Sequence, residues 1–251
     1  MRSNFTLYSS IDMMNKFIIT ISLLSLIVLS SCDDGRIYEK EVTFKEGKVV
    51  KMTGTLTGID SWGEGYNVAL AGFDDTDKYA IISRVIHTTE EGGKINIDLS
   101  GIDEEATHIE LCILNRLRQR VATVKEMPLE DTRDTIRFEI GDVDVSMLNI
   151  IQQQVFNNSC TACHGDNGRA ASGLNLTAGN SYGAMVNVPS KKVEGLNIVT
   201  PGDKENSVLH LLLNTELSSS WRQNHSDMLN KERTSALLTL IDDWIDNGAK
   251  Q

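Results

Sequence analysis

The chain has 251 residues with 24 Lys and Arg against 35 Asp and Glu, so its formal net charge at pH 7 is −11. A phosphate backbone repels such an acidic chain, and we expect no nucleic-acid partner. Neither a phosphate-binding loop nor a dinucleotide fingerprint occurs in the sequence, so we also expect no nucleotide site. The length suffices for one large or two small domains with a packed core.

The N-terminal segment predicts export. Lys16 precedes an apolar run from Phe17 to Leu29, which has the length of a signal-peptide core and is short for a transmembrane helix. The run ends in Leu29-Ser30-Ser31-Cys32, which resembles the signal of bacterial lipoproteins. We therefore expect residues 1–31 to be the signal peptide and Cys32 to become the lipidated first residue. An ordinary secretory signal with an incidental cysteine is the alternative.

A lipid on Cys32 would make residues 32–37 a short polar tether between the membrane and the folded protein. The expected location is then the outer membrane or the periplasmic face of the inner membrane. Met13 or Met14 would provide a normal start for this signal, which makes the residues before them a candidate upstream extension.

Residues 38–141 predict an antiparallel β-sandwich of the immunoglobulin-like or fibronectin-like kind. Apolar and polar residues alternate in short runs separated by Gly, Asp and Asn, as in Ile136, Phe138 and Ile140. The predicted strands are Val42–Met52, Thr53–Ile59, Tyr66–Ala71, Tyr79–His87, Lys94–Leu99, His108–Leu114, Val121–Glu126 and Thr135–Ile140. Cys112 lies inside a strand and is interpreted as a buried, inert thiol.

Residues 145–251 show helical periodicity instead, which predicts an all-α domain. The predicted helices are 147–157, 181–188, 205–217 and 230–247. The last of them has an apolar stripe formed by Leu237, Ile241, Trp244 and Ile245.

The run Cys160-Thr161-Ala162-Cys163-His164 is the sequence feature that carries the most chemistry. Two thiols at this spacing can form thioethers with the two vinyl groups of a haem, and an imidazole directly after them can bind the iron. We therefore expect one covalent haem c on Cys160 and Cys163, with His164 as the proximal iron ligand. A redox Cys-x-x-Cys pair and half of a zinc site are the alternatives.

Residues 147–251 also resemble a small class I-type cytochrome c domain of the sort found in exported planctomycete and Bacteroidetes proteins. The resemblance rests on the following segments: Val155-Phe156, Cys160 to Gly165, Gly173-Leu174-Asn175-Leu176, Val199 to Asp203, Ser207-Val208-Leu209, and Ile241 to Ala249. It implies an all-α fold and a methionine on the far side of the iron. The matching residue is Met228, although leucine follows it where the family has proline.

Met228 is thus the expected distal ligand, with His225 as the second choice and His210 and Met185 behind them. The leading functional hypothesis is a lipid-anchored, single-haem electron carrier outside the cytoplasm, without substrate chemistry of its own and with an unidentified redox partner. One alternative is a haem subunit of an exported oxidoreductase or peroxidase. Another is a lipoprotein that binds a glycan or a partner, with Trp62, Tyr66 and Tyr79 as candidate stacking residues.

Overall fold

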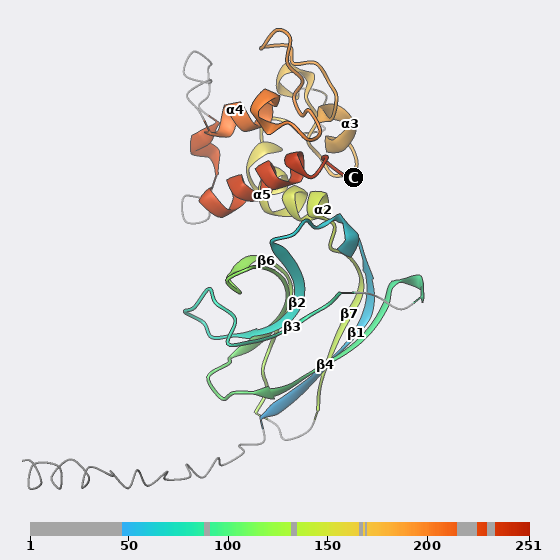
Figure 1. Cartoon of the computed structure of the whole chain (residues 1–251), viewed down its shortest axis with the longest axis vertical. Helices are drawn as coiled ribbons and strands as arrows, with labels where there is room; N and C mark the ends of the chain where they lie inside the picture. The colour runs from blue at the N-terminus through green and yellow to red at the C-terminus, as the bar shows by residue number, and fades with distance from the viewer. Residues whose placement is uncertain are drawn as a thin grey trace, which may run out of the picture. The chain divides into compact units, whose positions relative to one another are not determined.

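Among the residues that the computed structural model describes, seven β-strands in two sheets form the first part (Figure 1). The structure describes residues 47–87, 91–131, 135–165, 168, 170–214, 225–229 and 234–251. The predicted signal peptide, Cys32 and the tether all lie outside these residues. None of the described helices combines the length and the apolar character needed to span a membrane.

One sheet has three strands and the other has four. The three-stranded sheet has the order β4 (Lys94–Ile102), β1 (Lys48–Thr57), β7 (Ile136–Asp144). The four-stranded sheet has the order β3 (Ile82–Val85), β2 (Tyr66–Phe73), β5 (His108–Asn115), β6 (Arg120–Pro128). Both sheets contribute to one apolar core. Ile136, Phe138 and Ile140 of β7 face into it as their alternation predicts, and Leu70 of β2 and Ile109 of β5 belong to the same core.

The sequence-based prediction of an exclusively antiparallel sandwich is wrong at β1. This strand pairs antiparallel with β4 but parallel with β7. The pairing register shifts between Thr53 and Gly54, where a Cβ on Gly54 would lie 2.5 Å from the Ile140 side chain. Two predicted strands that met at Thr53 are therefore one strand with a bulge, since a bulge interrupts the alternation without ending the strand.

The predicted all-α cytochrome c domain is also wrong. Among the described residues the chain is mostly β, and its α-helices are four short ones: α2 (Met147–Ile151), α3 (Ser181–Met185), α4 (Val208–Asn214) and α5 (Thr234–Asp246). Irregular segments and isolated β-bridges connect them, including Val186 with Val199 and Asn197 with Ser207. The periodicity of such short segments located the helices without revealing how much extended chain lies between them.

Ser207 shows why one predicted helix, 205–217, is interrupted. Its backbone is extended, with φ −105° and ψ 122°. Its hydroxyl accepts a hydrogen bond from the Thr200 amide at 2.8 Å and donates one to the Asp203 carbonyl at 2.8 Å. These local bonds compete with helix formation, so a short 3₁₀ turn, Lys204–Asn206, precedes Ser207 and α4 begins only at Val208.

Aromatic residues at the end of the sheets bind the helical segments. The Trp62 indole donates to the Val145 carbonyl at 2.7 Å, and the Tyr66 hydroxyl donates to Asp243 of α5 at 2.7 Å. Trp62 and Tyr66 pack on each other with ring centroids 5.4 Å apart. Both side chains thus make contacts within the protein, and the glycan-stacking role of Trp62, Tyr66 and Tyr79 stays a prediction.

Candidate cofactor site

The Cys160 to His164 run follows a helix that changes type before it ends. α2 begins with the Ser146 side chain as its cap and continues into a π-helix, Gln152–Cys160. The bond from the Thr161 amide to the Phe156 carbonyl, at 2.9 Å, has the five-residue spacing of a π-helix. The helix therefore continues, in π-helical form, up to Cys160.

Cys160, Cys163 and His164 share one turn of the chain. The amides of Cys163 and His164 both donate to the Cys160 carbonyl, at 3.2 and 2.9 Å. This compact turn places the two thiols and the imidazole against the same space, and all three residues line one cavity of about 880 Å³. The structure thus places side by side the three residues that the sequence predicts to bind one cofactor.

The walls of this cavity are mainly apolar. They come from the π-helix, the segment after His164, α3, α4 and the residues before α5. The apolar residues that line it include Val155, Phe156, Leu174, Leu176, Met185, Val188, Ile198, Val208, Leu209, Leu212, Leu213 and Leu229. Such a cavity has the size and the character of a cofactor pocket, for which about 300–1,000 Å³ is usual.

His164 is held in a defined orientation. Its Nδ1 lies 3.2 Å from the Leu174 carbonyl, and its own carbonyl accepts from the Leu176 amide at 2.8 Å. A carbonyl can only accept a hydrogen bond, so Nδ1 carries the hydrogen and Nε2 keeps a free lone pair. A histidine that ligates a metal usually donates its other N–H in this way.

Gln152 connects the π-helix to the same segment. This buried side chain donates from Nε2 to the Leu176 carbonyl at 2.8 Å, and its Oε1 accepts from the Ser181 hydroxyl at 2.6 Å. The residues that hold His164 are therefore anchored to the helix that precedes Cys160. Sequence reasoning missed this role, because a single glutamine in a helix has no signal of its own.

The two cysteines do not have the features of a reactive redox pair. Neither Cys160 nor Cys163 forms a disulfide, and burial together with the neighbouring Cys163 raises the pKa of the Cys160 thiol to about 11. Redox-active Cys-x-x-Cys motifs lower a thiol pKa instead. Within the described parts of the chain, no three His, Cys, Asp or Glu side chains gather as a metal cage.

Two of the candidate distal ligands approach the cavity from the segment before α5. His225 is half-buried and Met228 is 36% exposed, and both line the cavity. The His164 and His225 ring centroids lie 6.3 Å apart with their planes inclined by 34°. Met185 is fully buried and also lines the cavity.

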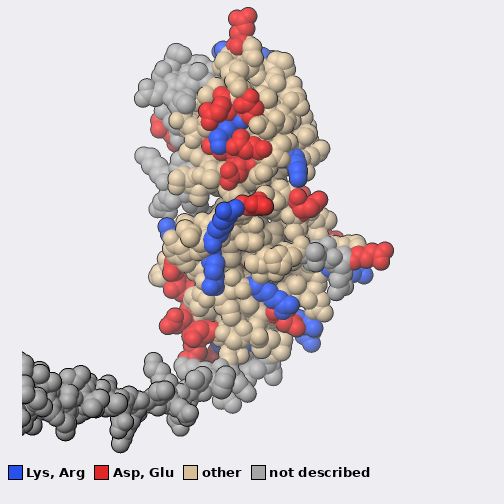
Figure 2. All heavy atoms as spheres, in the orientation of Figure 1, with Lys and Arg blue, Asp and Glu red and all other residues tan. Residues whose placement is uncertain are grey.

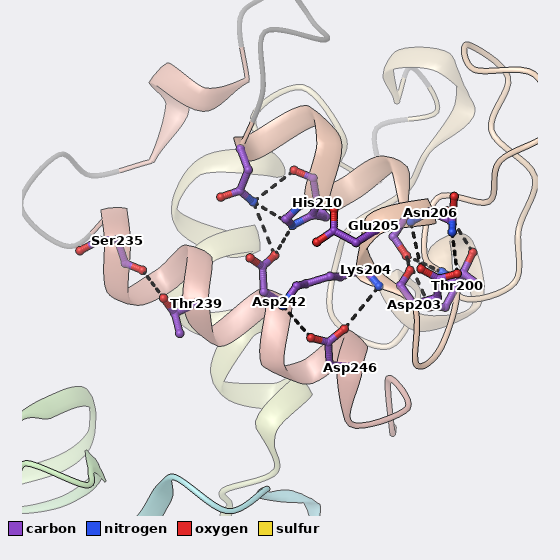
Figure 3. Close-up of polar contacts among 12 residues, drawn as sticks. Thr200, Asp203, Lys204, Glu205, Asn206, His210, Ser235, Thr239, Asp242 and Asp246 are labelled. Atoms are coloured by element: carbon purple, nitrogen blue, oxygen red, sulfur yellow. Dashed lines mark hydrogen bonds and ion pairs between the residues drawn. The ribbon is translucent and has the colours of Figure 1, made fainter.

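The remaining candidate, His210, lies outside this arrangement. Its Nδ1 is 2.7 Å from Asp242 of α5, within the polar cluster drawn in Figure 3. His210 is absent from the cavity lining. In Figure 2 acidic side chains gather on the part of the chain that contains α4 and α5. Lys204 pairs with Asp246 at 2.7 Å in the cluster of Figure 3. His210 thus belongs to a cluster of polar side chains outside the cavity.

Two lysines at the cavity were not singled out by sequence reasoning. Lys191 and Lys192 both line it, are both exposed, and follow Pro189 and Ser190 on the loop after α3. The Lys191 ammonium donates to the Ser172 carbonyl at 3.0 Å. In a chain of net charge −11, two adjacent lysines were the sequence signal that could have pointed to this part of the cavity.

Among known proteins, no family model matches the chain, and no curated protein matches it.

Proposed function

We propose that this protein is a c-type cytochrome: it carries one haem on Cys160, Cys163 and His164 and passes single electrons outside the cytoplasm. The observation that carries the proposal is that both thiols and an imidazole with a fixed orientation line one apolar cavity. Lipid on Cys32 would hold the protein at a membrane. When bound, haem supplies an iron that takes up and releases one electron at a time.

The residues at the cavity fit this group in four respects. Two thiols one turn apart match the two vinyl groups, and the His164 Nε2 is available because Nδ1 is bonded to Leu174. The cavity volume of about 880 Å³ and its apolar walls suit a porphyrin. Lys191 and Lys192 at the cavity are suited to neutralise the carboxylates that a haem carries.

The residues around the cofactor have distinct roles in this proposal. Cys160 and Cys163 would hold the porphyrin covalently, which would keep it in place outside the cytoplasm. Leu174 and Gln152 position His164 through the bonds described above. Apolar residues such as Phe156 and Leu176 would exclude water from the cofactor. A dry surrounding limits the access of small molecules to the iron, and electron exchange then remains its main reaction.

The test is a pyridine haemochrome spectrum of the full chain matured in a periplasm that contains the cytochrome c assembly machinery. We expect covalent haem in the unchanged protein and none in the Cys160→Ala/Cys163→Ala double variant. Cys112→Ala is the matched control: it removes a thiol that is buried on the four-stranded sheet, away from the cavity, and should retain covalent haem. Lack of covalent haem in the unchanged protein would overturn the proposal.

A further inference from the structure

We infer that His225, and not Met228, is the second axial ligand, so that the iron is held between two imidazoles. This inference rests on the proposed function and deepens it, because it names the group opposite His164. It departs from the methionine that the cytochrome resemblance implies.

The spacing of the two rings carries the inference. An imidazole nitrogen binds a metal at about 2.0–2.1 Å and lies about 1.1 Å from its ring centre, so imidazoles on opposite sides of one iron have centroids about 6.2–6.4 Å apart. The His164 and His225 centroids are 6.3 Å apart. The backbone thus already holds both rings at the separation that a single iron between them requires.

The cavity distinguishes this arrangement from ordinary packing of two rings. Rings in contact also span centroid distances of about 4.5–7 Å. His164 and His225, however, line the same cavity of about 880 Å³ as Cys160 and Cys163, the two residues that would hold the porphyrin. The space beside the rings is therefore the space that the macrocycle would fill.

His225 and Met228 compete for one position. The Met228 amide donates to the His225 carbonyl at 3.1 Å, which makes them the first and fourth residues of one turn. Side chains at this spacing lie on the same side of a 3₁₀ turn, so both cannot bind one iron face. Met228 is 36% exposed, while His225 is half-buried with its ring near His164. The geometry favours the histidine.

Two imidazole ligands have a consequence for function. Ligation by two histidines gives a lower reduction potential than ligation by histidine and methionine. A filled sixth position also favours electron transfer over the binding of small molecules. The protein would then donate electrons to acceptors that a methionine-ligated cytochrome reduces poorly.

The experiment records the near-infrared and electron paramagnetic resonance spectra of the oxidised full-length holoprotein and its variants. We expect a low-spin iron without the weak methionine–Fe(III) band, and Met228→Ala should leave this spectrum unchanged. His225→Ala should lose the low-spin signal and, once reduced, bind carbon monoxide at least tenfold faster. His225→Met should gain the methionine band. The matched control is His210→Gln, which removes a histidine outside the cavity and should change nothing.

A methionine band in the unchanged protein that Met228→Ala abolishes would overturn the inference and leave the haem proposal intact. A low-spin signal that survives in His225→Ala would overturn it equally. Failure of the proposed function has a different signature, because the unchanged protein would then contain no covalent haem and no haem spectrum would be recorded.

Discussion

The Nδ1 of His164 lies 3.2 Å from the carbonyl oxygen of Leu174, ten residues later in the chain. This bond connects the segment that follows the Cys-x-x-Cys-His run to the histidine of that run. Nδ1 is the donor in it, so Nε2 keeps its lone pair. The same segment is tied to the π-helix by Gln152, which bonds the Leu176 carbonyl. The orientation of a candidate iron ligand thus depends on side chains that would never touch the iron.

Replacing Gln152 with Leu should lower the free energy of unfolding by about 1–3 kcal/mol, because the buried Ser181 hydroxyl and the Leu176 carbonyl lose partners. Urea denaturation followed by circular dichroism measures this. Gln153→Leu is the matched control on the same helix, since Gln153 is exposed and its change should stay within about 0.5 kcal/mol. Equal effects from the two substitutions would contradict the anchoring role of Gln152.

The hydrogen bond between Tyr66 and Asp243 predicts a pH dependence. Burial and the bond to Asp243 raise the pKa of Tyr66 above its ordinary value of 10.0. Above pH 10 the unfolded chain loses this proton while the folded protein keeps it, so the free energy of unfolding should fall as the pH rises. Tyr66→Phe should remove this part of the fall.

At pH 7 the same substitution should cost about 1–3 kcal/mol, because it deletes a bond to a carboxylate. Tyr79→Phe is the control, as Tyr79 is 40% exposed and its backbone pairs with Gln119. Thermal denaturation of the three proteins between pH 7 and 11 is the measurement. If Tyr66→Phe retained the full alkaline loss of stability, the assigned cause would be wrong.

Alkylation should distinguish the two motif cysteines in haem-free protein. Cys163 is exposed, whereas Cys160 is half-buried and its pKa is raised to about 11. Only the thiolate reacts, so Cys160 should label far more slowly at pH 8 and gain rate up to about pH 11. Mass spectrometry of peptides after timed treatment with iodoacetamide follows both sites. Faster labelling of Cys160 than of Cys163 at pH 8 would contradict the burial of its sulfur.

The lysines at the cavity should raise the reduction potential of the bound haem. Positive charge favours the state that has gained an electron, so Lys191→Gln and Lys192→Gln should each lower the potential. Spectroelectrochemical titration of the holoprotein measures the change. Lys204→Gln provides the control, because Lys204 pairs with Asp246 in the cluster of Figure 3 and does not line the cavity. A shift of the same size in that variant would contradict a local effect.

Several elements of the fold follow from local sequence. The alternation of Ile136, Phe138 and Ile140 located β7 and its buried face, because a strand directs successive side chains to opposite sides. The apolar stripe through Leu237, Ile241 and Trp244 located α5 for the same kind of reason. The Cys160 to His164 run predicts haem attachment without a structure, because its spacing lets both thiols and the imidazole reach one porphyrin, and this stays a prediction.

Other features depend on residues far apart in the chain. The parallel pairing of β1 with β7 joins segments more than eighty residues apart, and no periodicity encodes a strand's partner or direction. The engagement of Tyr66 by Asp243 and the short helices within long irregular segments were equally invisible to patterns. These features depend on the fit between surfaces that are distant in the sequence, and that fit is determined only when the chain packs.

The candidate cofactor site divides in the same way. The sequence by itself predicted Cys160, Cys163 and His164 as the residues that attach the haem and bind one side of its iron, because these residues lie within one turn and their relation is local. The sequence left the ligand on the opposite side of the iron undecided, because both Met228 and His225 lie in the segment where the resemblance places it. The reason to infer His225 comes only from the tertiary structure, which holds its ring 6.3 Å from that of His164, since that distance depends on how the segment before α5 packs against the rest of the cavity.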